Sequence, residues 1–187
     1  IEEGSAAKIK QINIVGAKSF SEKELLSQFE LTTPGLITWY TKNDQYSRQK
    51  LSADLEKLKS FYMNQGYLEF AVESTQVSIS PDKQDVYITA NINEGDRYQV
   101  SSVKMAGDFS IAEDELKKLV TIKPGDVFSR DKLNATTKAI SDRLGKEGYA
   151  FANVNAAPEI DKEKHHVAFT IFVDPGKRVY VRRLNIT

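Results

Sequence analysis

The chain has 187 residues, of which 40% are hydrophobic and 28% charged, a composition typical of an ordinary globular protein. Its 26 Lys and Arg balance 26 Asp and Glu, which disfavours a nucleic-acid binder, and the basic pairs at 177–178 and 182–183 are typical of a solvated edge. The lack of cysteine excludes disulfides and thiolate chemistry while leaving the compartment open, and no apolar run approaches the ~20 residues that cross a bilayer.

The first elements are a strand and two helices. Alternating apolar residues predict a strand over 8–15, and Ser21 with Glu24 forms a capping-box pattern that starts a short helix. Ser47 is the next candidate N-cap, and Gly66 lies where a left-handed helix C-cap is needed. The long helix presents its apolar side chains at helical spacing, namely Leu51, Leu55, Leu58 and Tyr62.

Two strands follow, over 68–79 and 86–92, around a polar turn at 80–85. The second half of the chain repeats this order. Ser110 with Glu113 predicts a capped helix, and Ser129 predicts the start of the next one. The remaining predictions are strands over 100–105, 150–160 and 167–173, and a helix face of Leu133, Thr137, Ile140 and Leu144.

The repeat predicts tandem small domains. Gly4, Gly95 and Gly176 close equivalent patterns and lie 91 and 81 residues apart, a period too long for a solenoid. We expect an α+β fold of two β-α-α-β-β modules, each with two helices on a three-stranded mixed sheet. The expected boundaries are 1–7 for the tail of a preceding module, 8–96 and 97–176 for two complete modules, and 177–187 for the first strand of a following one. The chain would then be a slice of a larger protein.

The last strand of each module is predicted to be central, because 167–173 is apolar almost throughout. The strand before it must then lie at an edge, and Pro158 supports that position because proline cannot donate a ladder hydrogen bond. In the first module the apolar residues change parity between Val72 and Val77, which predicts a β-bulge within 73–76. The second module is one residue shorter there and should lack the bulge.

The first candidate site is the edge strand of the first module. An incoming strand could pair with it through main-chain hydrogen bonds, with little demand on side chains. Alternatively, the bulge only protects the edge from aggregation. The candidate residues are Glu69, Phe70, Ala71, Val72, Glu73, Ser74, Thr75, Gln76 and Val77.

Two other segments are candidates. An insert of eight residues before Ser47 carries Trp39 and Tyr40, which could form a partner patch or fold as a lid over a thin core. The junction between the modules could be a hinge or a fixed elbow. Its residues are Gly95, Asp96, Arg97 and Tyr98.

No catalytic residue, metal site or cofactor is expected. His165 and His166 are adjacent and point in opposite directions, so they cannot readily chelate one metal. The carboxylates at 113–115 fall in the first turn of a predicted helix, where the macrodipole favours them. There is also no nucleophile beside a histidine and no glycine-rich phosphate loop.

The whole chain resembles the POTRA modules of BamA-type outer-membrane β-barrel assembly factors. The strings at 11–16, 66–67, 74–77 and 94–95 resemble the third module of that family, and those at 123–125, 148–150 and 158–160 the fourth. The string at 178–182 resembles the entry to the fifth.

The resemblance implies a periplasmic scaffold that receives unfolded outer-membrane β-barrel proteins and neighbours other POTRA modules. It also implies docking of the accessory lipoprotein BamB at the first complete module, and an outer-membrane barrel in the full-length protein. Three alternatives stay open: a POTRA tandem of a related secretion or translocation pore, an enzyme, and a purely structural spacer.

Overall fold

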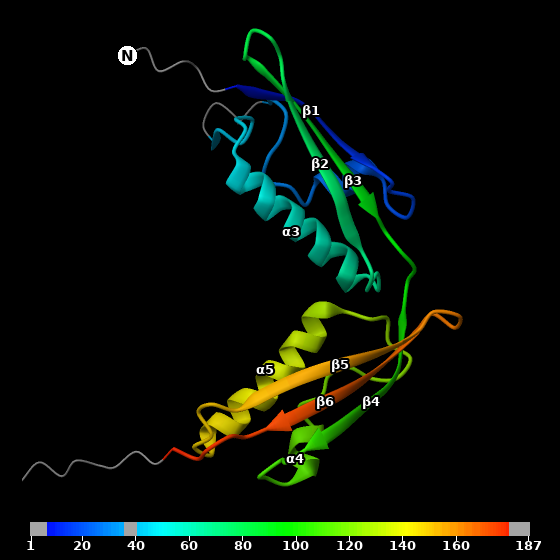
Figure 1. Cartoon of the computed structure of the whole chain (residues 1–187), viewed down its shortest axis with the longest axis vertical. Coiled ribbons are helices and arrows are strands. Elements are labelled where there is room, and N and C mark those ends of the chain that lie inside the picture. The colour runs from blue at the N-terminus through cyan, green and yellow to red at the C-terminus, as the bar shows by residue number, and fades with distance from the viewer. Residues whose placement is uncertain (1–6, 36–40, 180–187) are drawn as a thin grey trace, which may run out of the picture. The chain divides into compact units, whose positions relative to one another are not determined.

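The computed structural model describes residues 7–35 and 41–179 and divides the chain into two compact units, Ile1–Asp96 and Arg97–Thr187. In each unit a long helix lies along one face of a sheet (Figure 1). The elements of the first unit are β1 (Lys8–Val15), α1 (Glu22–Leu26), α3 (Arg48–Asn64), β2 (Ala71–Ile79) and β3 (Asp85–Asn93). Those of the second unit are β4 (Gln99–Gly107), α4 (Glu113–Lys117), α5 (Arg130–Lys146), β5 (Asn153–Asp161) and β6 (His166–Asp174).

Both sheets have the predicted mixed topology. The strand order is β1-β3-β2 in the first unit and β4-β6-β5 in the second. The first strand of each sheet runs parallel to the central strand, and the third runs antiparallel to it. The prediction that β2 and β5 are edge strands is therefore confirmed, with Pro158 on β5.

Three of the four predicted helix N-caps are confirmed. The hydroxyls of Ser21, Ser47 and Ser129 each accept a hydrogen bond from the backbone N–H three residues on. The prediction for Ser110 was wrong, because Ala112 occupies the N-cap of α4 and makes no side-chain cap bond. Ser110 instead has φ 57° and donates its backbone N–H to the Asp108 carboxylate over 3.1 Å. The Ser110 N–H bonds to the Asp108 side chain in a local turn, and this turn takes the place of the expected N-cap.

Left-handed glycines end the long helices as predicted. Gly66 has φ 103° and Gly148 has φ 94°. The chain then makes a further turn in the first unit, where the Phe70 N–H donates to the Tyr67 carbonyl over 3.2 Å. This turn explains why β2 begins at Ala71 rather than at the predicted residue 68. β5 likewise starts three residues later than predicted.

The predicted bulge is present in β2. The pairing with β3 shifts register between Val72 and Ser74, so Glu73 is the extra residue, whereas β5 pairs with β6 without a shift. Two further bulges were not predicted, at Lys10 in β1 and Ser101 in β4. The same signal was present, because buried Ile9 and Ile12 have opposite parity.

The core of each unit lies between its helices and its sheet. In the second unit Thr136, not the predicted Thr137, is fully buried on α5, and its hydroxyl lies 3.1 Å from that of Thr121. Thr137 is half-buried, and its hydroxyl donates to the Asn134 carbonyl over 3.1 Å. The buried residues of the first unit include Ile9, Ile12, Leu31, Leu51, Leu58, Tyr62, Phe70, Val86, Ile88 and Ile92.

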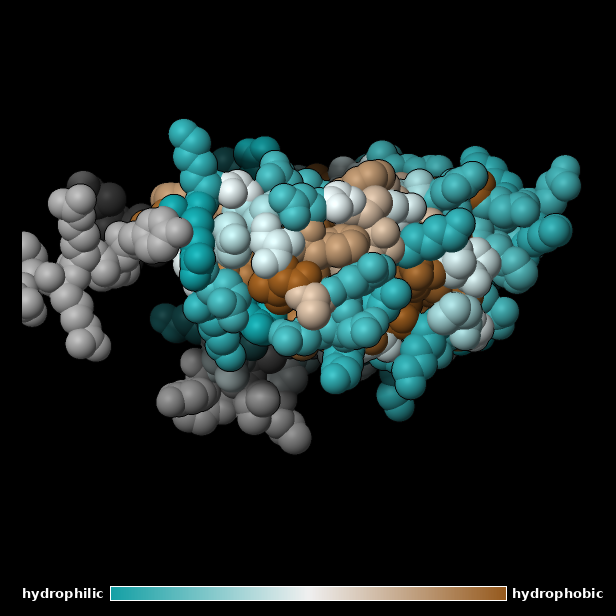
Figure 2. Space-filling model, turned by 90° about the horizontal axis from the view of Figure 1, so that it is seen from below, coloured by the Kyte–Doolittle hydropathy of each residue, from teal (hydrophilic) through white to brown (hydrophobic). Residues whose placement is uncertain are grey.

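The surface is not uniformly polar. Figure 2 shows apolar side chains gathered between hydrophilic ones on the face seen from below. Among the described residues, no helix has both the length and the apolar character needed to cross a membrane. Over the same residues, no group of three or more His, Cys, Asp or Glu is arranged to hold a metal ion.

Candidate protein-binding edge

The outer edge of β2 is open to solvent. Every residue of this strand except Val72 is exposed, and β2 ends the strand order of its sheet. Pairing with β3 uses one side of its backbone, so the N–H and C=O groups on the other side face no strand of the described chain. This row of donors and acceptors can receive another extended segment.

Two of the predicted contact residues precede this edge. Glu69 is exposed in the turn before β2. Phe70 is 4% exposed, and its ring stacks on that of Tyr62 with centroids 4.3 Å apart. Phe70 therefore belongs to the core, and its role as a contact residue stays a prediction. Its parity had placed it on the correct face, but the turn at 67–70 carries it beneath the helix.

The distal half of β2 has two chemically different faces. Val77 lies opposite Ile88 and Ile79 opposite Val86, and paired residues of an antiparallel sheet share a face. Val86 and Ile88 are buried, yet Val77 remains 37% and Ile79 56% exposed. The other face is polar and carries Ser74, Gln76 and Ser78.

Ile79 was missing from the predicted site, although its parity with Val77 was visible in the sequence. An added strand would find an apolar surface on the helix side of β2 and a polar one on the opposite side. The Ser74 hydroxyl illustrates the polar side, since it accepts a hydrogen bond from the Asn91 amide over 2.8 Å.

The other predicted residues separate into two groups. Trp39 and Tyr40 lie outside the described residues. In the junction, Gly95 has φ 69°, and Asp96 and Arg97 are exposed, but Tyr98 is fully buried. The Tyr98 carbonyl accepts a hydrogen bond from the Phe128 N–H over 3.0 Å, which ties Tyr98 to the second unit. The hinge over 95–98 stays a prediction, and so does its alternative, a fixed elbow.

A buried carboxylate anchors the end of β3. Glu94 is 8% exposed and accepts hydrogen bonds from the Tyr62 hydroxyl over 2.7 Å and from the Ser19 N–H over 3.1 Å. Burial alone would raise the pKa of Glu94, but these hydrogen bonds outweigh it and hold that pKa below its ordinary value. Burial, and then the bond to Glu94, raises the pKa of Tyr62 well above its usual range. The sequence marked Glu94 as part of a repeat but gave no sign of this role.

The comparison with protein families is decisive for the fold. The sequence pattern of the POTRA family, described as a surface antigen variable number repeat, matches residues 7–95 and 98–176. The chain belongs to the POTRA family. The expected resemblance to POTRA modules, and the fold of two such repeats, are thereby confirmed.

The relatives of these POTRA modules include outer membrane protein assembly factors named BamA. The chain is 35% identical to BamA of Neisseria meningitidis, with all of this chain and 24% of that protein covered. It is 33% identical to BamA of Buchnera aphidicola, with all of this chain and 30% of that protein covered. The chain therefore spans between about a quarter and a third of the length of these two curated relatives.

A solved structure agrees with these relatives. The crystal structure of Haemophilus influenzae BamA POTRA3-5 superimposes with a TM-score of 0.81 at 28% identity, covering 94% of this chain and 69% of that one. A structure of Haemophilus ducreyi BamA lacking POTRA domains 1-3 has a TM-score of 0.67 at 17% identity and shows the shared fold.

Proposed function

We propose that this POTRA pair is a periplasmic protein-binding part of an outer-membrane β-barrel assembly factor. Its relatives over the whole chain carry that name, and the likeness to a POTRA3-5 structure supports its place as the third and fourth modules. We propose 8–96 and 97–176 as the complete modules, 1–7 as the tail of a preceding one and 177–187 as the first strand of the next. The full-length protein would be in the bacterial outer membrane.

The β2 edge is proposed as the receiving surface, and the observation that carries this proposal is its exposed, alternating distal half. Main-chain hydrogen bonds would supply affinity for segments of many sequences. Val77 and Ile79 would add a preference for an apolar side chain at every second position. Transmembrane β-strands alternate in this way, so unfolded outer-membrane β-barrel proteins are the proposed substrates.

Binding rather than catalysis is the proposed activity throughout. The accessory lipoprotein BamB is proposed to dock on the first module, and neighbouring POTRA modules on either side. No titratable cluster at the β2 edge points to bond-making chemistry, and the buried carboxylate of Glu94 is engaged by Tyr62 and Ser19. A scaffold of this kind needs backbone edges, not nucleophiles.

The proposal is tested by placing proline on the strand. Successive N–H groups of a strand point to opposite sides, and the Ser80 N–H points to β3, where it donates to the Asp85 carbonyl over 2.9 Å. Thr75→Pro therefore removes an outward donor, and Gln76→Pro breaks the ladder with β3. The outward proline should leave the thermal unfolding temperature within a few degrees of the parent. It should weaken binding of a peptide of eight alternating Val and Thr residues about tenfold in isothermal titration.

The control is Lys138→Ala on the exposed surface of α5, which should bind as the parent does. If the folded variant with the outward proline binds the peptide as tightly as the parent does, the β2 edge is not the binding surface.

A further inference from the structure

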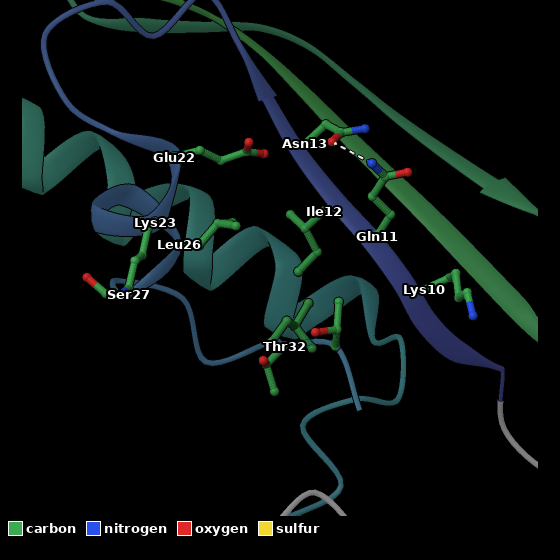
Figure 3. A pocket seen from close by; sticks show the side chains of 11 residues that line it. Lys10, Gln11, Ile12, Asn13, Glu22, Lys23, Leu26, Ser27 and Thr32 are labelled. Carbon is green, nitrogen blue, oxygen red and sulfur yellow. Dashed lines mark hydrogen bonds between the residues drawn. The ribbon is translucent and has the colours of Figure 1, made fainter. Parts of the chain in front are cut away.

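A groove runs along the opposite edge of the first sheet, between β1 and α1 (Figure 3). We call it the β1 groove. Its volume is about 570 Å³, and its lining comes from 10–13 on β1, from α1 and Ser27, and from the segment 31–33. The groove lies at the far end of the strand order from β2, so its contents would not compete for the β2 edge.

The outer edge of β1 is closed at both ends and open between them. At its start the Ile9 N–H donates to the Asp44 carbonyl over 2.6 Å, and the Tyr46 N–H donates to the Ala7 carbonyl over 3.3 Å. At its end the Ile14 N–H points to a Glu22 carboxylate oxygen at 3.4 Å. Residues 10–13 remain, facing no strand of the described chain on that side. This gap fits a short extended segment of about four residues, or ~13 Å.

The floor of the groove is apolar. Ile12 and Leu26 lie between β1 and α1 in Figure 3, and Leu31 also lines the groove. Ile12 is 7% and Leu31 2% exposed, while Leu26 is half-buried. A strand added to β1 could therefore place an apolar side chain against Leu26 on the helix side of the sheet. The paired strand on the other side of β1, β3, likewise buries Val86 and Ile88 on that face.

Two lysines flank the floor from different elements. Lys10 is the bulge residue of β1, and bulges commonly redirect a side chain. Lys23 projects from α1. Both are exposed, and neither forms an ion pair with the described residues. The one carboxylate of the lining, Glu22, accepts a long hydrogen bond of 3.4 Å from the Ile14 N–H and keeps its negative charge. The groove thus offers two lysines against one carboxylate, beside apolar surface.

The second unit holds the same groove with different charges. It is lined by Val103 and Ile122, the residues 91 positions after Ile12 and Leu31, and has a volume of about 520 Å³. At the positions of Lys10 and Lys23, however, it has Ser101 and Asp114. Lys117 stands where Leu26 does and pairs with Glu113 over 3.1 Å. The shape recurs, and the unpaired positive charge at these two positions does not.

We propose that the β1 groove binds a short extended segment of a partner protein in which apolar and acidic residues alternate. The segment would add a strand to 10–13, place an apolar side chain on the floor and bring its carboxylates to Lys10 and Lys23. This surface is separate from the β2 edge, and the proposal does not depend on the function assigned to that edge.

The test is a titration of the whole ¹⁵N-labelled chain with capped hexapeptides followed by amide chemical shifts. A peptide of alternating valine and glutamate should shift the amides of 10–13 and of α1. Replacing its glutamates with glutamine should weaken binding about two- to fivefold for each exposed ion pair lost. Lys10→Gln and Lys23→Gln should each weaken it by the same factor, and the double variant by the product. The matched variant Lys104→Gln, at the groove of the second unit, should change nothing.

Four results would overturn the proposal. The first is equal affinity for the glutamate peptide and for one of alternating valine and lysine. The second is unchanged affinity in the double variant, whose exposed substitutions leave the fold intact. The third is a shift of 10–13 that follows protein concentration without peptide, because a second copy would then be the occupant. Shifts confined to 71–79 would also reject the β1 groove while supporting the β2 edge, so the two proposals fail separately.

Discussion

Glu94 and Tyr62 form a hydrogen bond that holds the end of β3 to the core of the first unit. The carboxylate also accepts from the Ser19 hydroxyl over 3.2 Å, so one side chain joins α3, β3 and the loop before α1. Its lowered pKa means that the folded chain holds the charged form more favourably than the unfolded chain does. The resulting stability is present above the ordinary carboxyl pKa and is lost as the pH falls through the lowered one.

Removing the hydroxyl tests this interaction. We expect Tyr62→Phe to lower the free energy of unfolding by about 1–2 kcal/mol at pH 7, because Glu94 loses its buried donor. The difference from the parent should shrink as the pH falls through the lowered pKa of Glu94, because the charged acceptor is then lost. It should also shrink above pH ~10, because the raised pKa of Tyr62 makes ionisation favour the unfolded chain.

Urea unfolding monitored by circular dichroism at pH 3, 7 and 10.5 measures these differences. Tyr87→Phe is the control, since that ring is 39% exposed and should cost less than 0.5 kcal/mol. A Tyr62→Phe penalty that stays constant with pH would contradict the linkage.

At the scale of the elements, the long helix of each unit holds the turn that follows the short helix. In the first unit the fully buried Asp54 carboxylate accepts from the N–H groups of Glu30 and Leu31, both over 2.9 Å. In the second unit the Thr136 hydroxyl takes this place and accepts from the Thr121 N–H over 3.3 Å. The long helix thus holds this turn through a charged carboxylate in the first unit and through a neutral hydroxyl in the second.

Truncating Asp54 should therefore cost more than truncating its counterpart. We expect Asp54→Ala to destabilise the first unit by about 3 kcal/mol, because two buried N–H groups lose a charged acceptor, and Thr136→Ala to cost about 1 kcal/mol. Lys57→Ala removes an ion pair of 3.7 Å to Asp54 from a half-exposed lysine and should cost less than 1 kcal/mol. Chemical unfolding of the three variants measures these differences. An Asp54→Ala penalty no larger than that of Lys57→Ala would refute this role of the carboxylate.

The elements also show how far the sequence could predict the structure. Local signals succeeded where one residue decides the geometry, as at the Ser47 and Ser129 caps and at Gly66. The parity change before Val77 predicted a bulge within 73–76, because a strand with one buried face cannot otherwise reverse its alternation, and the structure has it at Glu73. The prediction of an N-cap at Ser110 was wrong, because the Ser110 N–H bonds to the Asp108 carboxylate in a local turn. Helix and cap propensities do not show which of the two arrangements is more stable.

The sites were less predictable than the elements. Phe70 was assigned to the edge because strand alternation was extended through a turn that only tertiary packing reveals. The β1 groove was missed altogether, because its lining comes from elements separated in sequence, with Lys10 on β1 and Lys23 on α1. The charge of one exposed lysine does not indicate a binding site until its neighbours in space are known.

At the scale of the whole molecule, two modules of one fold offer unequal surfaces. Both have an edge strand after the long helix, but β2 has a bulge and exposed Val77 and Ile79, whereas β5 has Pro158. The first groove carries Lys10 and Lys23, whereas the second has Ser101 and Asp114 at those positions and an exposed lysine, Lys104, at another. Repetition of the fold has thus preserved the shape of the surfaces while changing their chemistry, and we expect the first module to make the principal partner contacts.

The central claim, that β2 receives an extended strand, is tested most directly by disulfide capture. The chain has no cysteine, so Gln76→Cys and its control on β5, Asn155→Cys, each introduce a single exposed thiol. Each variant would be incubated under mild oxidation with a peptide of alternating Val and Thr residues that carries one central cysteine. We expect capture at residue 76 to exceed capture at residue 155 at least fivefold, and to fall to the β5 level when Thr75→Pro, the outward proline, is added. Equal capture at both strands would contradict the account.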